Sequence, residues 1–394
     1  MRIAILSDFH LGYDRFREDA FRQAQEALAR AASGADALII PGDIFDNRTP
    51  KPDVIAEAIN LFRDLSKRTW GAKVTGFEGK GQHYTDIPII AIPGTHERRA
   101  QDAADPVGLL GLAGLIVGIS NATVMLEKDG ERVAVVGIGG IADERFKQVV
   151  AESDPRPVEG AFSIFMFHES VYELLPFNES FIKQDELPAG FDLYVCGHIH
   201  NSVDSQVHGK KFLIPGSTVL TQLKAGEQEK KGLYIYDTKT GTYEFIGIES
   251  RRFVLVKVKM GADTTALEGV EREMEKAIGS SGDRPIVRVV VEGDSTSPRI
   301  GMELGMLQKK YQDKAVVEVS GPGISSTAKS VNADTEAPKF ENMSIKDYGM
   351  GVFIEKLRQK GVSFGKVGPA DLFDALSLEG SKDKAIRKAL DMLL

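Results

Sequence analysis

The sequence is poor in cysteine and lacks a long apolar run, and both absences exclude classes of protein. Cys196 is the sole cysteine among 394 residues, so no disulfide forms within the chain, as is usual in a reducing cytoplasm. The longest apolar stretch, residues 108–119, is too short and too rich in glycine to span a bilayer. Met1-Arg2 leads straight into a strand-like run, with no signal peptide. We therefore expect a cytoplasmic protein that does not enter a membrane.

A strongly basic composition, which is typical of many nucleic-acid-binding proteins, is also lacking. The formal net charge is -8 at pH 7. An acidic balance does not exclude such binding, because bound cations and local clusters of lysine and arginine reverse the sign at a site. Hydrophobic residues make up 42% of the chain, which is enough for a sizeable core, and the length suggests two or three domains.

The first part of the chain, residues 1–250, alternates short apolar runs with amphipathic stretches. The runs "RIAIL", "IPIIAI" and "FSIFMF" predict buried strands, and "DRFREDAFRQAQEALARAA" predicts a surface helix. Apolar and polar residues alternate on both sides of Thr240-Gly241, and this pattern predicts a hairpin. Early helix–strand alternation followed by hairpins indicates an α/β domain with a mixed sheet.

The remainder of the chain divides into three parts. Residues 251–320 alternate strand and helix patterns and predict a small α+β domain. Residues 321–344 are rich in Gly, Ser, Pro and Asn and predict a flexible linker. Residues 345–394 carry amphipathic helices, which either pack against the body of the protein or bind a partner; the long linker favours a partner.

Acidic residues and histidines follow five of the predicted strands. The junctions read "SDFH", "PGDIFD", "PGTHE", "FHES" and "CGHIH". In α/β proteins the carboxyl ends of strands are where ligands bind, and five such junctions in order exceed what turn residues alone explain. The candidate ligands are Asp8, His10, Asp43, His168, His198 and His200.

These residue types suit divalent metals. Mixed histidine and carboxylate donors favour Mn, Fe or Zn over an all-oxygen calcium site. Six donors exceed one tetrahedral site and fit two ions ~3.5–4 Å apart, with an anionic oxygen between them. Asp43 is the candidate for that bridge. His96 is the candidate to protonate a leaving oxygen or to orient a phosphate, unless it only bonds backbone. Glu97 or Asp46 is placed to orient a histidine.

The five motifs, in this order, resemble the signatures of the calcineurin-like metallophosphoesterases, and the resemblance covers residues 1–250. It implies a four-layer sandwich, with two mixed β-sheets flanked by helices. Within the superfamily the chain resembles the Mre-eleven/SbcD DNA double-strand-break repair nucleases, with an archaeal appearance. "GDIFDNRTPKPDVIAEAINLF", "IPGST" and the order of nuclease domain, capping or DNA-binding domain and C-terminal helices carry this resemblance.

The resemblance implies two Mn ions per chain. Asp8, His10, Asp43 and His200 would hold one ion, and Asp43, His168 and His198 the other. His96 matches the family's catalytic histidine. The family's second metal also takes an Asn from a "GNH" motif, where this chain has Thr95. The Thr95 hydroxyl either caps the loop or reaches the metal. A further family histidine is Asp46 here, either orienting a histidine or lying in a solvated turn.

The implied activity is that of a Mn-dependent 3′-to-5′ exonuclease on duplex DNA and an endonuclease on single strands. The family works as a homodimer with a Rad-fifty/SbcC-type coiled-coil ABC ATPase, which the C-terminal helices would bind. Cations beside the motifs are candidates for contacts with DNA phosphates, although charged surface explains any one of them. They are Arg15, Arg17, Arg48, Lys51, Arg98 and Arg99.

Two other functions fit the sequence. The first is a phosphatase or small phosphodiesterase of the same superfamily, since "GDxxD" and "THE" also resemble phosphoprotein phosphatases. Arg48 is displaced by one position from the phosphatase pattern, and the second domain and tail have no role in that interpretation. The second is a non-catalytic scaffold on a degenerate phosphoesterase fold, which the substitutions at Thr95 and Asp46 suggest.

Overall fold

The structure, a computed structural model, describes most of the first 320 residues. The described ranges are 1–82, 85–98, 104–176, 178, 180–259, 265–279, 284–292 and 298–320, and they lie within one compact unit, Met1–Ser326. Arg99, the predicted linker at 321–344 and the predicted helices at 345–394 lie outside the described residues, and their roles stay predictions.

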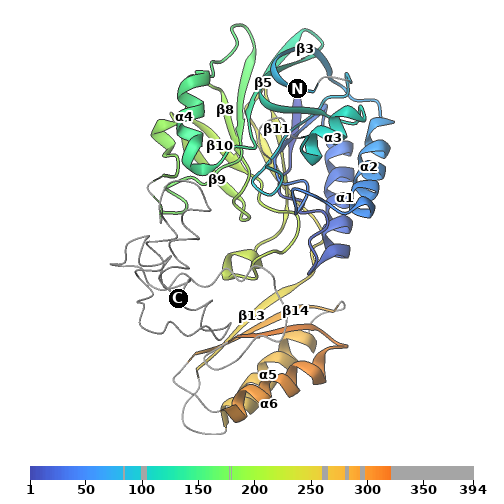
Figure 1. Cartoon of the computed structure of the whole chain (residues 1–394), viewed down its shortest axis with the longest axis vertical. Helices are drawn as coiled ribbons and strands as arrows, with labels where there is room; N and C mark the ends of the chain where they lie inside the picture. The colour runs from blue at the N-terminus through green and yellow to red at the C-terminus, as the bar shows by residue number, and fades with distance from the viewer. Residues whose placement is uncertain are drawn as a thin grey trace, which may run out of the picture. The chain divides into compact units, whose positions relative to one another are not determined.

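One large mixed sheet forms the body of the protein (Figure 1). Its strands follow the order β12-β11-β1-β2-β4-β5-β6-β7-β8-β10-β9, and β3 pairs with β5 beside this path. The central pairs β1–β2, β2–β4, β6–β7 and β7–β8 are parallel, so their carboxyl ends share an edge within each half of the sheet. The strands are β1 Arg2–Ile5, β2 Ala37–Pro41, β3 Lys73–Gln82, β4 Ile89–Ile92, β5 Val117–Lys128, β6 Glu131–Ile138, β7 Phe162–Phe167, β8 Leu193–Cys196, β9 Val203–Val207, β10 Lys210–Ile214, β11 Gly232–Asp237 and β12 Tyr243–Gly247.

Helices cover both outer faces of this body (Figure 1). The face of α1 that carries Ala24, Ala27, Leu28 and Ala31 is buried, at the spacing expected of an amphipathic helix. Proline stands at the start of α2 and of α3, where its missing N–H costs no hydrogen bond. The helices are α1 Arg17–Gly34, α2 Pro52–Ser66, α3 Pro106–Leu112 and α4 Asp143–Ser153, with short 3₁₀ turns η1 Gln184–Glu186 and η2 Ala225–Gln228.

Alternate residues of each central strand enter different cores. Ile3 of β1 and Met166 of β7 share a central core, whereas Ala4 packs beneath α1 and Phe165 packs on the side of α4. The four-layer α/β arrangement expected from the motifs is therefore confirmed. The two expected sheets are two halves of one hydrogen-bonded sheet, because β5 pairs with β4 through its first residues and with β6 through its last.

A second, parallel sheet of three strands lies between residues 253 and 320 (Figure 1). Its strands are β13 Phe253–Lys259, β14 Ile286–Glu292 and β15 Val316–Ser320, and its helices are α5 Thr265–Gly279 and α6 Pro298–Tyr311. A small apolar core joins this sheet to the body, since Phe253 and Ile286 contact the loop that carries Leu223. The strands and helices stand where the sequence predicts them, and the division into domains at residue 250 stays a prediction.

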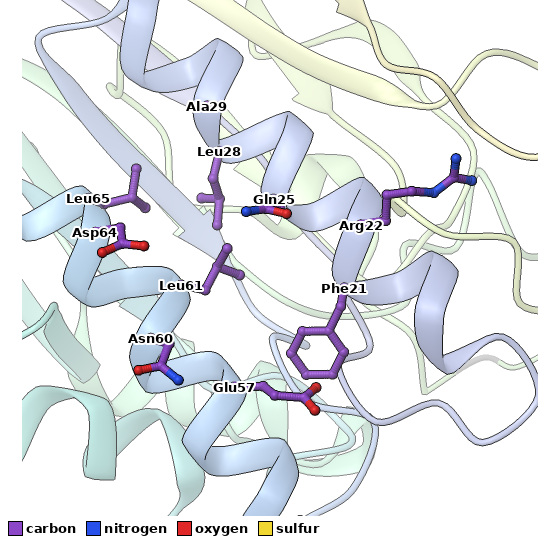
Figure 2. A pocket seen from close by; sticks show the side chains of 10 residues that line it. All are labelled: Phe21, Arg22, Gln25, Leu28, Ala29, Glu57, Asn60, Leu61, Asp64 and Leu65. Atoms are coloured by element: carbon purple, nitrogen blue, oxygen red, sulfur yellow. The ribbon is translucent and has the colours of Figure 1, made fainter.

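A groove of about 510 Å³ runs between α1 and α2 (Figure 2). Phe21, Leu28 and Leu61 line it with apolar surface, and Arg22 and Asp64 stand at its polar edges. None of the candidate metal ligands is among the residues that line this groove. In the part of the chain that the structure describes, no helix has the length and apolar character needed to cross a membrane.

Since both faces of β7 are buried, substitution on either face should be costly. We expect Phe165→Ala to lower the free energy of unfolding by about 3–5 kcal/mol and Met166→Ala by about 2–5 kcal/mol, because each leaves a cavity. Met306→Ala, at an exposed position of α6, should change it by less than about 0.5 kcal/mol. Urea denaturation measures all three. A wild-type midpoint for either β7 variant would show that its side of the strand is not core.

Candidate metal centre

The candidate ligands stand on loops that leave the carboxyl ends of neighbouring strands. Asp8 and His10 follow β1, and Asp43 follows β2, in one half of the sheet. His168 follows β7, and the pair formed by His198 and His200 follows β8, in the other half. Packing of the two halves against one another brings both sets of loops to a common site.

One cluster joins Asp8, His10 and His200, whose ligand atoms all lie within 4.8 Å of one another. The Nε2 atoms of the two imidazoles are 3.2 Å apart. The Oδ1 atom of Asp8 is 3.9 Å from Nε2 of His10 and 3.8 Å from Nε2 of His200. Three of the six ligands predicted from the sequence therefore converge on one point.

A second cluster joins Asp43, His168 and His198 within the same limit. Nε2 of His168 is 3.2 Å from Oδ2 of Asp43, and the rings of His168 and His198 are 5.3 Å apart. The two clusters adjoin, because the backbone N–H of His198 donates to both carboxylate oxygens of Asp8 at 3.2 Å.

Groups behind three of the imidazoles fix the direction in which each ring presents its other nitrogen. Nδ1 of His10 lies 3.1 Å from Oδ1 of Asp46, and Nδ1 of His168 lies 2.6 Å from the carbonyl oxygen of Pro41. Nδ1 of His200 lies 2.5 Å from Oγ1 of Thr221. With the proton on Nδ1, each Nε2 lone pair faces its cluster, as in metal sites whose histidines bond a neighbouring acceptor.

This donor set fits divalent cations. Carboxylate oxygens and imidazole nitrogens converge in both clusters, and Nε2 of His168 is buried beside the Asp43 carboxylate at 3.2 Å. The side chains of Asp8 and Asp43 are at most 1% exposed, so water does not compensate their charge. Imidazole and carboxylate together suit Mn, Zn or Fe, and the arrangement does not distinguish among these ions.

Four of these candidate ligands have a left-handed backbone, which is strained for residues other than glycine. The φ angles are 53° at Asp8, 48° at His10, 51° at Asp43 and 75° at His198. Such conformations cost about 1–3 kcal/mol each and persist where the surroundings enforce them. Gly94 permits the close approach of two loops, since a Cβ atom there would collide with the Asp43 carboxylate. The strain falls on the loops that converge on the site.

Charges within the site displace several pKa values. Burial lowers the pKa of His168, but the carboxylates of Asp43 and Asp8 outweigh it and raise that pKa to about 10. Burial raises the pKa of Asp43, but the positive charge and hydrogen bond of His168 outweigh it, so that pKa lies below its usual range. Burial, followed by the charge of His168, lowers the pKa of His198 to about 4. In the metal-free chain an imidazolium therefore compensates Asp43.

Glu97 holds together the loop that follows β2 and the loop that follows β4. Its buried carboxylate accepts hydrogen bonds from the backbone N–H groups of Phe45 and Gly94, both at 2.8 Å. Burial and the nearby charge of Asp43 outweigh these bonds and raise its pKa to about 8. Its contacts are with backbone, so it fixes loops; of Glu97 and Asp46, the two residues expected to orient a histidine, Asp46 is the one beside an imidazole, that of His10.

His96 stands at the exposed edge of the first cluster. Its side chain is 42% exposed, and its ring centroid lies 4.9 Å from that of His10. Its Nδ1 donates to the carbonyl oxygen of Asp46 at 2.9 Å. Its backbone N–H donates to Oδ1 of Asp43 at 2.9 Å. The neighbouring hydroxyl, Oγ1 of Thr95, is 3.3 Å from Nδ1 of His198, a position compatible with either expectation for this residue.

Three of the six cations predicted to bind DNA form ion pairs with acidic residues. Arg15 forms an ion pair with Glu318 of β15. Arg17 lies 2.8 Å from Asp53 and 3.0 Å from Glu57. Lys51 lies 3.5 Å from Asp14. Arg48 is exposed in the loop before α2, and Arg98 is partly buried in the loop that follows β4. Their contact with DNA stays a prediction.

Metal binding should release protons at neutral pH. His168 keeps its proton at pH 7.5 in the metal-free chain because its pKa is raised to about 10, and a cation binds Nε2 only after that proton has left. We expect release of about one proton from this residue, and tighter binding as the pH rises toward 10. Calorimetric titration with Mn in two buffers of different ionisation enthalpy measures the release. Equal heats in both buffers would contradict it.

Comparison with known proteins adds to this geometry. A family model described as calcineurin-like phosphoesterase matches residues 1–202. The chain is 27% identical over 351 residues to "DNA double-strand break repair protein Mre11" of Methanopyrus kandleri, covering 81% of this chain and 70% of that protein. It is 28% identical over 312 residues to "Double-strand break repair protein MRE11" of Encephalitozoon cuniculi, covering 71% of this chain and 52% of that protein.

Among solved structures, an archaeal phosphodiesterase is 16% identical, covers 63% of this chain and 100% of its own, and has a TM-score of 0.32. A score this low does not show a shared fold, whereas the family model shows the family. That model covers 202 of the 394 residues and includes all the loops that carry the candidate ligands. The chain therefore belongs to the calcineurin-like phosphoesterase family and is a metal-dependent phosphodiesterase.

Proposed function

We propose that this chain is the nuclease subunit of a DNA double-strand-break repair complex in the cytoplasm. Two Mn ions would support 3′-to-5′ exonuclease activity on duplex DNA and endonuclease activity on single strands. The observation that carries the proposal is the pair of adjoining clusters, which hold all six predicted ligands. The similarity to proteins named for double-strand-break repair covers well over half of the chain and indicates DNA as the substrate.

The residues available to each ion follow from the two clusters. Asp8, His10 and His200 would hold one ion and Asp43, His168 and His198 the other; Asp43 would also serve the first ion. Two bound ions supply charge compensation for the phosphodiester and an activated water. Thr95 would offer its hydroxyl to the second ion, beside His198.

His96 has the position of an acid for the leaving oxygen. A carbonyl oxygen accepts its Nδ1–H, so a protonated ring carries its second proton on Nε2. Partial exposure leaves the ring accessible to a substrate phosphate. His96 would thus orient the phosphate and give a proton to the departing oxygen.

Substrate choice tests the proposal directly. The purified chain would be given duplex DNA, single-stranded DNA and bis-nitrophenyl phosphate, each with and without Mn. We expect cleavage of both DNAs that needs the metal. Turnover of the small ester alone would refute a nuclease and favour the small phosphodiesterase.

Removing the His96 ring should separate catalysis from metal binding. We expect His96→Ala to slow DNA cleavage by about 10²–10⁴-fold, because the proton donor is lost, while Mn binding stays close to wild type. His208→Ala is the matched control, since that ring lies outside both clusters and bonds the carbonyl oxygen of Leu187. Loss of both ions in His96→Ala would reassign His96 as a ligand.

The proposed partners are a second copy of the chain and a coiled-coil ABC ATPase. Leu109 and Leu112 of α3 are 41% and 51% exposed, which supports a protein contact at this helix. The ATPase would bind the predicted helices at residues 345–394.

Truncation tests the partner assigned to the tail. Deletion of residues 346–394 should leave nuclease activity unchanged and abolish co-purification with the ATPase, because the deleted helices carry the docking surface. Pull-down with the full chain as the control measures this. Unchanged association of the truncated chain would contradict the assignment.

A further inference from the structure

Behind His200 lies a buried polar network that the motifs do not include. Oγ1 of Thr221 is 2.5 Å from Nδ1 of His200 and 3.2 Å from Oε1 of Glu227. The Glu227 carboxylate is buried and has no place in the expected set of ligands. Two hydrogen bonds, both to the Thr221 hydroxyl, connect this carboxylate to the His200 imidazole.

Glu227 holds the loop of Thr221, Gln222 and Leu223 in one conformation. Its carboxylate accepts the backbone N–H groups of these three residues at 3.0, 2.8 and 2.6 Å. The loop includes a left-handed residue, Leu223, with a φ of 53°. Three N–H groups on one carboxylate give the strained loop a fixed position, and with it the hydroxyl that faces His200.

The opposite side of this loop is fixed as well. Arg288 of β14 donates to the carbonyl oxygen of Leu223 at 3.1 Å, and the hydroxyl of Tyr13 donates to that of Thr221 at 2.8 Å. The peptide groups of the loop thus lie between the anion Glu227 at their N–H ends and the cation Arg288 at a C=O end. The small sheet therefore contributes to the position of the loop.

A buried ammonium completes the network. Nζ of Lys231 donates to the carbonyl oxygen of His200 and to Oγ of Ser217, both at 3.0 Å, and lies 3.6 Å from Oε1 of Glu227. It compensates the charge of Glu227 and holds the backbone of the histidine. Removing an ammonium and a carboxylate from water is costly, and an apolar pair of similar volume would fill the same space without that cost. Packing alone therefore does not explain this pair.

The directions of these hydrogen bonds determine where the His200 proton lies. A carboxylate only accepts, so the Thr221 hydroxyl donates to Glu227 and accepts from Nδ1–H of His200. The Nε2 lone pair of His200 then faces Asp8 and His10, as ligation requires. Because the hydroxyl proton is directed to the carboxylate, the hydroxyl oxygen can only accept from the ring, and Nδ1 of His200 carries the proton.

We propose that Glu227, acting through Thr221, is a positioning residue that holds His200 in the tautomer able to bind the first metal ion. This inference rests on the proposed two-metal function, since it concerns one of the ligands. The fifth motif supplies the candidate ligand His200, and the loop after β10, which lies outside the five motifs, would orient it.

The test compares Thr221→Val with Thr221→Ser in the full chain. Spectra of ¹⁵N-histidine-labelled, metal-free protein report the tautomer, and a His200→Gln variant identifies the resonance. We expect Nδ1–H on His200 in the wild type and in Thr221→Ser. In Thr221→Val we expect a shift toward Nε2–H and about 10–100-fold weaker binding of one of two Mn ions. Glu227→Gln should shift both readouts in the same direction.

Thr218→Val is the matched control. This residue lies on the same segment, is fully buried, and its hydroxyl has no hydrogen-bond partner within the described part of the chain. It should match the wild type in both readouts. A wild-type tautomer and wild-type Mn affinity in folded Thr221→Val would overturn the inference, even where the wild type cleaves DNA. A wild type that binds two ions but cleaves no DNA would refute the proposed function and leave the tautomer result standing.

Discussion

Two carboxylates, those of Asp8 and Asp43, are buried at neighbouring strand ends, and the site is organised around their charge. Neither is open to water, so each needs a positive partner close by. In the metal-free chain the protonated ring of His168 is that partner for Asp43. Divalent ions would take over this role and add the charge that a phosphodiester needs. The same requirement explains why imidazoles, and not further carboxylates, fill the remaining positions.

The surrounding structure serves to hold these groups where they would otherwise not stay. Four candidate ligand residues keep a left-handed backbone, Gly94 gives the Asp43 carboxylate room, and the Glu97 carboxylate fastens two loops. The sandwich supplies the rigid support, since both faces of the central strands are buried. Strain of this kind persists only where many contacts enforce it, and those contacts are supplied by parts of the chain far apart in sequence.

Much of the fold and the set of candidate ligands is predictable from the sequence, because apolar runs and the polar residues that end them are local signals. The pairs at residues 8 and 10 and at 198 and 200 stand directly after such runs. β3 escapes such reasoning, since "KVTGFEGKGQ" is rich in glycine and lysine and is a strand only through its pairing with β5. The union of two expected sheets through the ends of β5 is likewise a matter of pairing.

The supporting groups are harder to predict. Thr221 and Glu227 belong to no motif. They lie 21 and 27 positions after His200 in the sequence, and only the folded chain brings them next to its ring. The ion pair of Arg15 with Glu318 spans 303 positions and joins the body to the small sheet. No local pattern records such contacts, so the sequence indicates which residues could bind a metal and leaves open what orients them.

The number of ions that the chain binds tests the central claim most directly. The full chain would be loaded with Mn, dialysed, and measured by metal analysis together with protein concentration. Two ions per chain are expected, because two adjoining clusters each bring one carboxylate and two imidazoles together. Less than one ion per chain would contradict the account and would favour a scaffold that has kept the fold without its metals.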